Sequence, residues 1–291
     1  MELSGIYSFP GTNLSVNRMG YGAMQLSGPE IYGPPRDIDE AIAVLREAVE
    51  SGVNHIDTSD FYGPHITNQI IQKALHPYPK ELIIVSKIGA KRGTDKSWQR
   101  AMLKEEITAG VHDNLRNLKI EAIDIVNLRM GGFTDPVEEP LTEQLGVLVD
   151  LKKQGYIKHI GLSTVSARQI AEAQKLTDIV CVQNFYNIAK RTDDALIEDL
   201  AREKIAYVPY FPLGGFVPLQ VELLDQISRE LNVTSMQVAL AWLLQRSPNI
   251  LLIPGTSNRV HLRENLKAAS LKLPDAVVNK LNEISTSVGA K

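Results

Sequence analysis

Hydrophobic and polar positions divide the chain into short apolar runs and longer amphipathic stretches. The apolar runs are rich in β-branched residues, which is typical of buried parallel strands. They lie at Met19–Met24, Val53–Ile56, Leu82–Val85, Ile123–Leu128, Ile157–Leu162, Ile179–Val182, Ile205–Val208 and Ile250–Ile253. The second run contains two polar residues, so its assignment rests on its position in the series.

Most segments between these runs have apolar residues three and four positions apart, which predicts helices with one buried face. In two of them a glycine, Gly52 or Gly155, marks the end of the helix. The predicted helices are Asp37–Ser51, Trp98–Leu115, Leu141–Gln154, Ala167–Gln174, Asp193–Arg202, Ser235–Gln245, one that contains Glu264–Ala269, and an extra C-terminal helix at Asp275–Ser285.

This alternation predicts an α/β protein, a (β/α)8 TIM barrel that forms a single domain over residues 1–291. A doubly wound open sheet is the main alternative, but the turn after the first run, MGYGAMQLSG, does not fit the G-x-G-x-x-G fingerprint of that fold. Gly5–Phe9 and Leu14–Val16 flank a Pro-Gly-Thr-Asn turn and predict an N-terminal β-hairpin before the barrel.

Composition narrows the class of protein. The net charge of −3 gives no basic surplus for a phosphate backbone, so we expect no nucleic-acid partner. The single cysteine, Cys181, suits a reducing cytoplasm, and the N-terminus does not resemble a signal peptide. No uncharged stretch approaches the roughly 18 residues that span a bilayer, and the histidines show no metal-binding spacing, so we expect neither a membrane span nor a metal. The oligomeric state stays open.

Barrel enzymes carry their chemistry at the C-terminal ends of the strands. Asp57, Tyr62 and Lys87 follow two neighbouring runs there. An ammonium group stabilises a nearby phenolate, and an aspartate keeps the ammonium charged, so Tyr62 would protonate a carbonyl oxygen. The alternative is a structural Asp57–Lys87 ion pair beside a packed aromatic ring.

Six motifs in order along the chain resemble those of the aldo-keto reductases, over nearly the whole length. They are GVNHIDTSDFYG, IIVSKIG, GYIKHIGLST, VQNFYN, YVPYFPLGG and IPGTSNRVHLRENL. The resemblance favours the catalytic interpretation of Asp57, Tyr62 and Lys87. It implies an enzyme that uses NADPH to reduce a small-molecule aldehyde or ketone to an alcohol.

The resemblance also implies which residues bind the cofactor. Ser163 and Gln183 would bond the nicotinamide carboxamide, and Tyr210 would stack on the ring. At the other end of the cofactor, Thr256 and Ser257 would contact the adenosine phosphate region. The start of the helix near Val260 would also face this phosphate. Glu264 and Asn265 would contact the adenine. The remaining candidates are Thr164, Pro212, Leu213, Gly255, Arg259 and Arg263.

Two departures from the family pattern bear on specificity. Arg129 replaces the usual histidine after the fourth strand, which favours a polar, anionic or phenolate-bearing substrate; alternatively, it pairs with Asp60 or Asp135 and faces away. Gly255 and His261 replace the usual cations for the 2′-phosphate, which leaves the cofactor preference open. Arg259 and Arg263 would supply that charge, or lie on a solvated helix face.

Within the family, the segment around YGPHITNQ and the arginine at 129 most resemble the bacterial pyridoxal reductase-like members. Candidate pocket loops are Gln25–Arg36 and Gly131–Pro140, with Tyr32, Phe61, Phe133 and Phe216 as walls or as plain packing residues. Two other functions are a Schiff-base lyase that uses Lys87 and a redox-sensing partner protein that binds cofactor with little turnover.

Overall fold

The computed structural model describes residues 3–132, 134–212, 214 and 222–284. Its centre is a sheet of seven parallel strands in the order β11-β10-β9-β8-β5-β4-β3. The strands are β3 (Tyr21–Gly22), β4 (His55–Asp57), β5 (Ile83–Ile88), β8 (Ile123–Arg129), β9 (Ile157–Ser163), β10 (Ile179–Gln183) and β11 (Ala206–Tyr207). Neighbours in this sheet are also successive along the chain, as a barrel requires.

The predicted eighth strand, Ile250–Ile253, closes the barrel, although its pairing is too sparse to form a regular strand. Parallel bridges join Ile250 to Tyr207 at one edge of the sheet and Leu252 to Met19 at the other. The ring of strands is therefore complete, and the predicted (β/α)8 barrel is confirmed.

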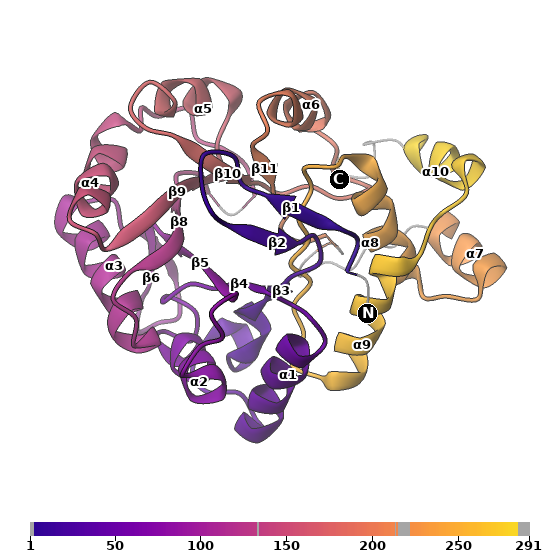
Figure 1. The fold of residues 1–291 in the computed structure, drawn as a ribbon, viewed down its shortest axis with the longest axis horizontal. Helices are drawn as coiled ribbons and strands as arrows, with labels where there is room; N and C mark the ends of the chain where they lie inside the picture. The colour runs from indigo at the N-terminus through magenta and orange to yellow at the C-terminus, as the bar shows by residue number, and fades with distance from the viewer. Residues whose placement is uncertain (1–2, 133, 213, 215–221, 285–291) are drawn as a thin grey trace.

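The predicted N-terminal hairpin consists of β1 (Ile6–Ser8) and β2 (Ser15–Asn17), which pair antiparallel. It lies across the N-terminal end of the barrel (Figure 1). Phe9, Leu14 and Val16 pack there against Ile83 and Val180 of the barrel interior. This apolar plug closes one end of the barrel, so only the opposite end can admit a ligand.

Helices surround the barrel (Figure 1). In α1, Asp37 caps the first turn by accepting the Glu40 amide at 2.9 Å, and Ala41, Leu45 and Ala48 face the core. No helix in the described ranges is long and apolar enough to cross a membrane. The α-helices are α1 (Ile38–Glu50), α2 (Ile66–Leu75), α3 (Lys104–Leu118), α4 (Thr142–Lys153), α5 (Ala167–Ala173), α6 (Asp194–Arg202), α7 (Glu222–Leu231), α8 (Ser235–Arg246), α9 (Arg259–Lys267) and α10 (Asp275–Asn282), with short 3₁₀ turns at η1 (Ala23–Leu26), η2 (Pro29–Ile31) and η3 (Ala268–Ser270).

The helix predicted at Trp98–Leu115 is wrong at its start. Residues Trp98–Arg100 form strand β7, which pairs antiparallel with β6 (Ala90–Arg92), and α3 begins only at Lys104. The start is fixed by Glu106, whose carboxylate accepts the Leu103 amide at 3.1 Å. Helices α2 and α7 were not predicted, whereas the extra C-terminal helix is present as α10.

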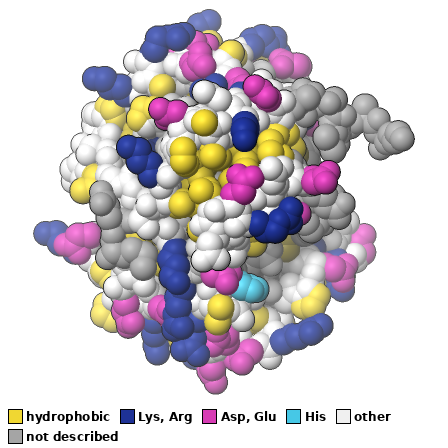
Figure 2. Space-filling model, turned by 90° about the vertical axis from the view of Figure 1, so that its right-hand side faces the viewer, with side chains coloured by type: hydrophobic (Ala, Val, Ile, Leu, Met, Phe, Trp, Pro, Cys, Tyr) yellow, Lys and Arg dark blue, Asp and Glu magenta, His cyan; other side chains and the backbone are white. Residues whose placement is uncertain are grey.

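Charged side chains of both signs lie side by side on the face that Figure 2 shows, which includes α7 to α10.

Candidate active site

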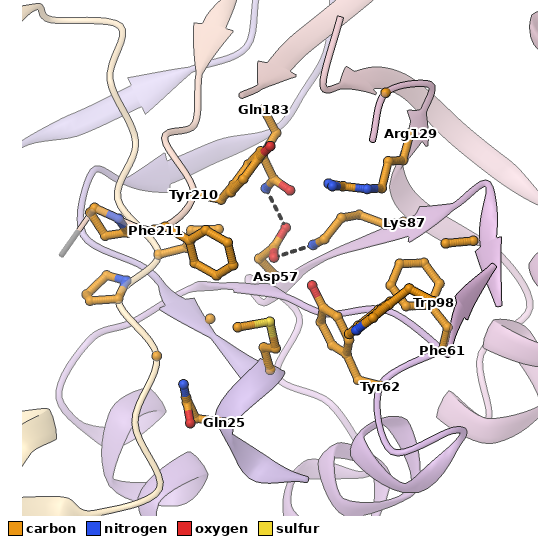
Figure 3. Close-up of a pocket in the computed structure, with 18 of the residues that line it drawn as sticks. Gln25, Asp57, Phe61, Tyr62, Lys87, Trp98, Arg129, Gln183, Tyr210 and Phe211 are labelled. Carbon is orange, nitrogen blue, oxygen red and sulfur yellow. Dashed lines mark hydrogen bonds and ion pairs between the residues drawn. The ribbon is translucent and has the colours of Figure 1, made fainter. Parts of the chain in front are cut away.

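A cavity of about 630 Å³ opens at the C-terminal ends of the barrel strands. Asp57, Lys87, Arg129 and Gln183 reach it from the ends of β4, β5, β8 and β10, and Tyr62 reaches it from the loop after β4 (Figure 3). Parallel strands therefore bring together residues that are far apart in the sequence.

Asp57 and Lys87 form a buried ion pair on the floor of this cavity, each only 4% exposed. The Lys87 ammonium also donates to the Thr58 carbonyl at 3.2 Å, and the Gln183 amide donates to the second Asp57 oxygen at 2.8 Å. Burial by itself lowers the pKa of Lys87, but the attraction of Asp57 and the contact with Tyr62 outweigh it and raise that pKa above its usual value. The ammonium thus keeps its charge.

Tyr62 lies beside this pair, with the Lys87 ammonium 5.5 Å from the ring centroid. Burial raises the pKa of Tyr62, and the positive charges of Lys87 and Arg129 offset that rise only in part. The hydroxyl is therefore protonated at neutral pH, and the nearby ammonium favours the phenolate once the proton has left. This combination suits a proton donor.

The loop that carries the tyrosine is held by a polar cluster. Asp60 pairs with His65 and accepts amide hydrogens from Asn117 at 2.9 Å and Asn68 at 3.2 Å. The hydrogen bond to Asp60 raises the pKa of His65. Possible ligand atoms of Asp60, His65 and Asp113 lie within 4.8 Å of one another, but protein donors already engage Asp60. That no metal binds stays a prediction.

Arg129 points into the cavity and lies beside Lys87 (Figure 3). Its guanidinium donates to the Gly132 carbonyl at 2.6 Å and lies 5.4 Å from the Tyr210 ring centroid. The two acids considered as its partners, Asp60 and Asp135, pair with His65 and Lys190 instead. The Arg129 guanidinium is part of the cavity lining.

The residues expected at the nicotinamide end are adjacent to this cavity. Ser163 and Thr164 are fully buried at the end of β9, and the Thr164 hydroxyl lies 3.2 Å from that of Tyr210. The Tyr210 ring stacks on Phe185 with centroids 5.8 Å apart and, with Pro212, lines the cavity. These groups provide an aromatic plane beside buried hydroxyls.

The residues expected at the phosphate end are split between the cavity and α9. Gly255 lines the cavity, and Thr256, Ser257, Glu264 and Asn265 follow on the segment that leads into and forms α9. Arg259 and Arg263 project from α9 toward α1. Their guanidinium groups pair there with Glu40 at 3.1 Å and with Glu47 at 2.5 Å.

Three residues that line the cavity were not predicted from the sequence. Trp98, placed in a helix by its pattern, lines the cavity, as do Phe211 and Met236. The turn residues of RGTDKS between β6 and β7 were the available signal for this hairpin. Three predicted residues, Phe133, Leu213 and Phe216, lie outside the described residues.

Comparison with known proteins gives consistent results. A model of the aldo/keto reductase family matches residues 18–286. Pyridoxine 4-dehydrogenase of Escherichia coli is 60% identical over 273 residues, which covers 93% of this chain and 96% of that protein. An uncharacterised oxidoreductase of Schizosaccharomyces pombe is 38% identical and covers 96% of this chain and 90% of its own length.

Solved structures agree with the fold. A thermostable aldo-keto reductase in complex with the inhibitor epalrestat superposes with a TM-score of 0.81 at 28% identity, covering 96% of this chain and 99% of that one. The predicted fold class and family resemblance are confirmed.

Proposed function

This chain belongs to the aldo/keto reductase family, and we propose that it uses NADPH to reduce the aldehyde of pyridoxal, or of a closely similar aromatic compound, to the alcohol. The observation that carries the proposal is the single cavity in which Asp57, Tyr62 and Lys87 meet Arg129. The similarity to pyridoxine 4-dehydrogenase supports the choice of substrate.

The chemistry of the donors around the cavity fits a nicotinamide nucleotide. The Gln183 side-chain amide and the Ser163 hydroxyl suit a carboxamide, and the Tyr210 ring offers a plane for a flat heterocycle. Arg259 and Arg263 lie at and near the start of α9, where cations and a helix N-terminus suit phosphate. When bound, a reduced nicotinamide supplies hydride.

Proton transfer is the task of this chain's own residues. The Tyr62 hydroxyl donates its proton to the carbonyl oxygen of the substrate, and the Lys87 ammonium stabilises the phenolate that remains. Asp57 keeps the ammonium charged and in place, and Gln183 fixes the orientation of the carboxylate. The apolar plug at the far end of the barrel leaves the cavity as the route to these groups.

Arg129 supplies the specificity expected for pyridoxal. The phenolic oxygen beside the aldehyde of pyridoxal carries negative charge when ionised, and a guanidinium binds such an oxygen by charge-assisted hydrogen bonds. Because Arg129 lines the same cavity as Phe61 and Trp98, its cation would meet the edge of a flat ring bound beside these aromatic side chains.

The other functions considered are not favoured. A Schiff-base lysine needs a depressed pKa, whereas the pKa of Lys87 is raised. A protein that only binds cofactor has no need of an assembled Asp57, Tyr62 and Lys87. We also propose a cytoplasmic location, because the only cysteine, Cys181, is buried and can form no internal disulfide.

The test is NADPH oxidation in the presence of pyridoxal, with benzaldehyde as the generic aromatic aldehyde and NADH as the alternative cofactor. We expect faster turnover of pyridoxal than of benzaldehyde. Tyr62→Phe should lower kcat by at least about 100-fold and leave NADPH binding intact, because only the proton donor is lost. NADPH binding without turnover of either aldehyde would overturn the proposal.

A further inference from the structure

The hairpin β6–β7 leaves the barrel directly after the strand that carries Lys87. Gly89 makes this exit possible: its φ is +104°, and a Cβ there would lie 2.4 Å from the Arg129 carbonyl oxygen. Within the hairpin, Arg92 stands directly opposite Trp98 in the antiparallel register. Paired residues on such strands place their side chains on the same face, within contact distance.

Arg92 is fixed on several sides. Its guanidinium lies 4.0 Å from the Trp98 ring centroid and 5.5 Å from that of Tyr32. It also donates to the carbonyls of Ile31 at 2.7 Å and Lys96 at 2.8 Å. A planar guanidinium held by carbonyls in its own plane and by rings on its faces has little freedom, so it fixes the plane of the indole.

Trp98 is 41% exposed although it is held in this way, and it lines the cavity. The ring of Phe61 contacts it edge-on at 5.9 Å and contacts Tyr62 edge-on at 5.2 Å. Figure 3 shows Trp98 beside Phe61 and Tyr62 and across the cavity from Tyr210. An exposed, oriented indole thus stands next to the proton donor.

We propose that Trp98 is a specificity-determining residue that stacks on the flat ring of an aromatic aldehyde, and that Arg92 is the positioning residue that holds the indole in the stacking plane. The inference rests on the proposed function and names the residues of this chain that would select planar aromatic aldehydes over aliphatic ones. A flat ring on the indole would have its carbonyl near the Tyr62 hydroxyl and its edge toward Arg129.

The test compares pyridoxal with butanal, an aliphatic aldehyde that cannot stack. Trp98→Ala should lower the pyridoxal-to-butanal ratio of kcat/KM by about ten-fold or more, mainly through KM for pyridoxal, because stacking of a heteroaromatic ring is lost. Trp98→Phe should restore most of the ratio. Lys91→Met is the matched control, because Lys91 is adjacent to Arg92 on β6 and pairs with Glu106. This variant should keep the wild-type pyridoxal-to-butanal ratio.

The positioning role of Arg92 is tested separately, by fluorescence quenching. Trp242, the other tryptophan, is fully buried, so quenching of fluorescence by acrylamide reports mainly on Trp98. Arg92→Met should increase that quenching and lower the pyridoxal-to-butanal ratio, and Arg92→Lys should not rescue either effect.

The outcomes separate the two proposals. If Trp98→Ala lowers kcat/KM for pyridoxal and for butanal equally, the stacking role of Trp98 is refuted, and the proposed reductase function is unaffected. If Arg92→Met changes neither the quenching nor the ratio, its positioning role is refuted. A wild-type protein that turns over neither aldehyde would overturn the proposed function itself.

Discussion

Acid should destabilise this protein through one buried imidazole, His55. It is 3% exposed on β4, two residues before Asp57, and neither ring nitrogen has a hydrogen-bond partner among the described residues. Burial lowers the pKa of His55 to about 4 from the ordinary value of 6.5. The folded protein therefore keeps this side chain neutral.

The sign and size of the effect follow from linkage. Between pH 6.5 and about 4, the unfolded chain binds a proton on this imidazole and the folded chain does not, so the free energy of unfolding falls as the pH falls. A pKa difference of about 2.5 corresponds to about 3 kcal/mol across that window. This is a large part of the about 5–15 kcal/mol that stabilises a typical protein.

The assay is urea unfolding at several pH values between 7 and 4 for wild type and His55→Met, which fills a similar volume without a titrating group. The wild type should lose about 3 kcal/mol more than the variant over this range. His112→Gln, a half-buried imidazole on α3, controls for the loss of a histidine. Parallel curves for wild type and His55→Met would refute the reasoning.

Two further predictions concern the cavity and the cofactor. Asp57→Asn should lower kcat by at least about 100-fold, because an amide cannot keep the buried Lys87 charged; steady-state kinetics with wild-type kcat would contradict this. Glu40→Gln should tighten NADPH binding by about two- to five-fold and leave NADH unchanged, because the Glu40 carboxylate now occupies both the side chain and the backbone amide of Arg259 at the start of α9. Fluorescence titration measures the dissociation constants of NADPH and NADH, with Glu50→Gln on the same helix as the control. Equal changes in affinity for both cofactors would exclude competition between Glu40 and the 2′-phosphate for Arg259.

The fold could be predicted because its signals are local and repeat. Each β/α unit has an apolar run and an amphipathic segment, and the sheet order then follows from the order of the units. The errors occur where local signals are weak or ambiguous. Helix α2 begins after His65, which has a left-handed backbone and provides no side-chain cap, so no start signal precedes it.

The candidate site could be predicted only where the barrel itself positions the side chains. Asp57, Lys87 and Gln183 stand at strand ends, so the topology alone brings them together. Trp98 could not be found in this way, because its position depends on a hairpin whose residues also fit the first turn of a helix. Its orientation depends on Arg92, whose contacts reach back to residues near position 31.

The proposed proton transfer accounts for the buried Asp57–Lys87 pair better than a role in stability does. Removing two charges from water costs several kcal/mol per ion, and their attraction often does no more than compensate, so an apolar pair of similar volume would serve the barrel equally well. What an apolar pair cannot do is stabilise a phenolate on Tyr62. The same burial that makes the pair costly raises the pKa of that tyrosine and keeps its proton available. In the proposed mechanism, desolvation therefore has two effects: it makes a purely structural ion pair costly, and it keeps Tyr62 neutral beside a fixed ammonium, as a proton donor requires.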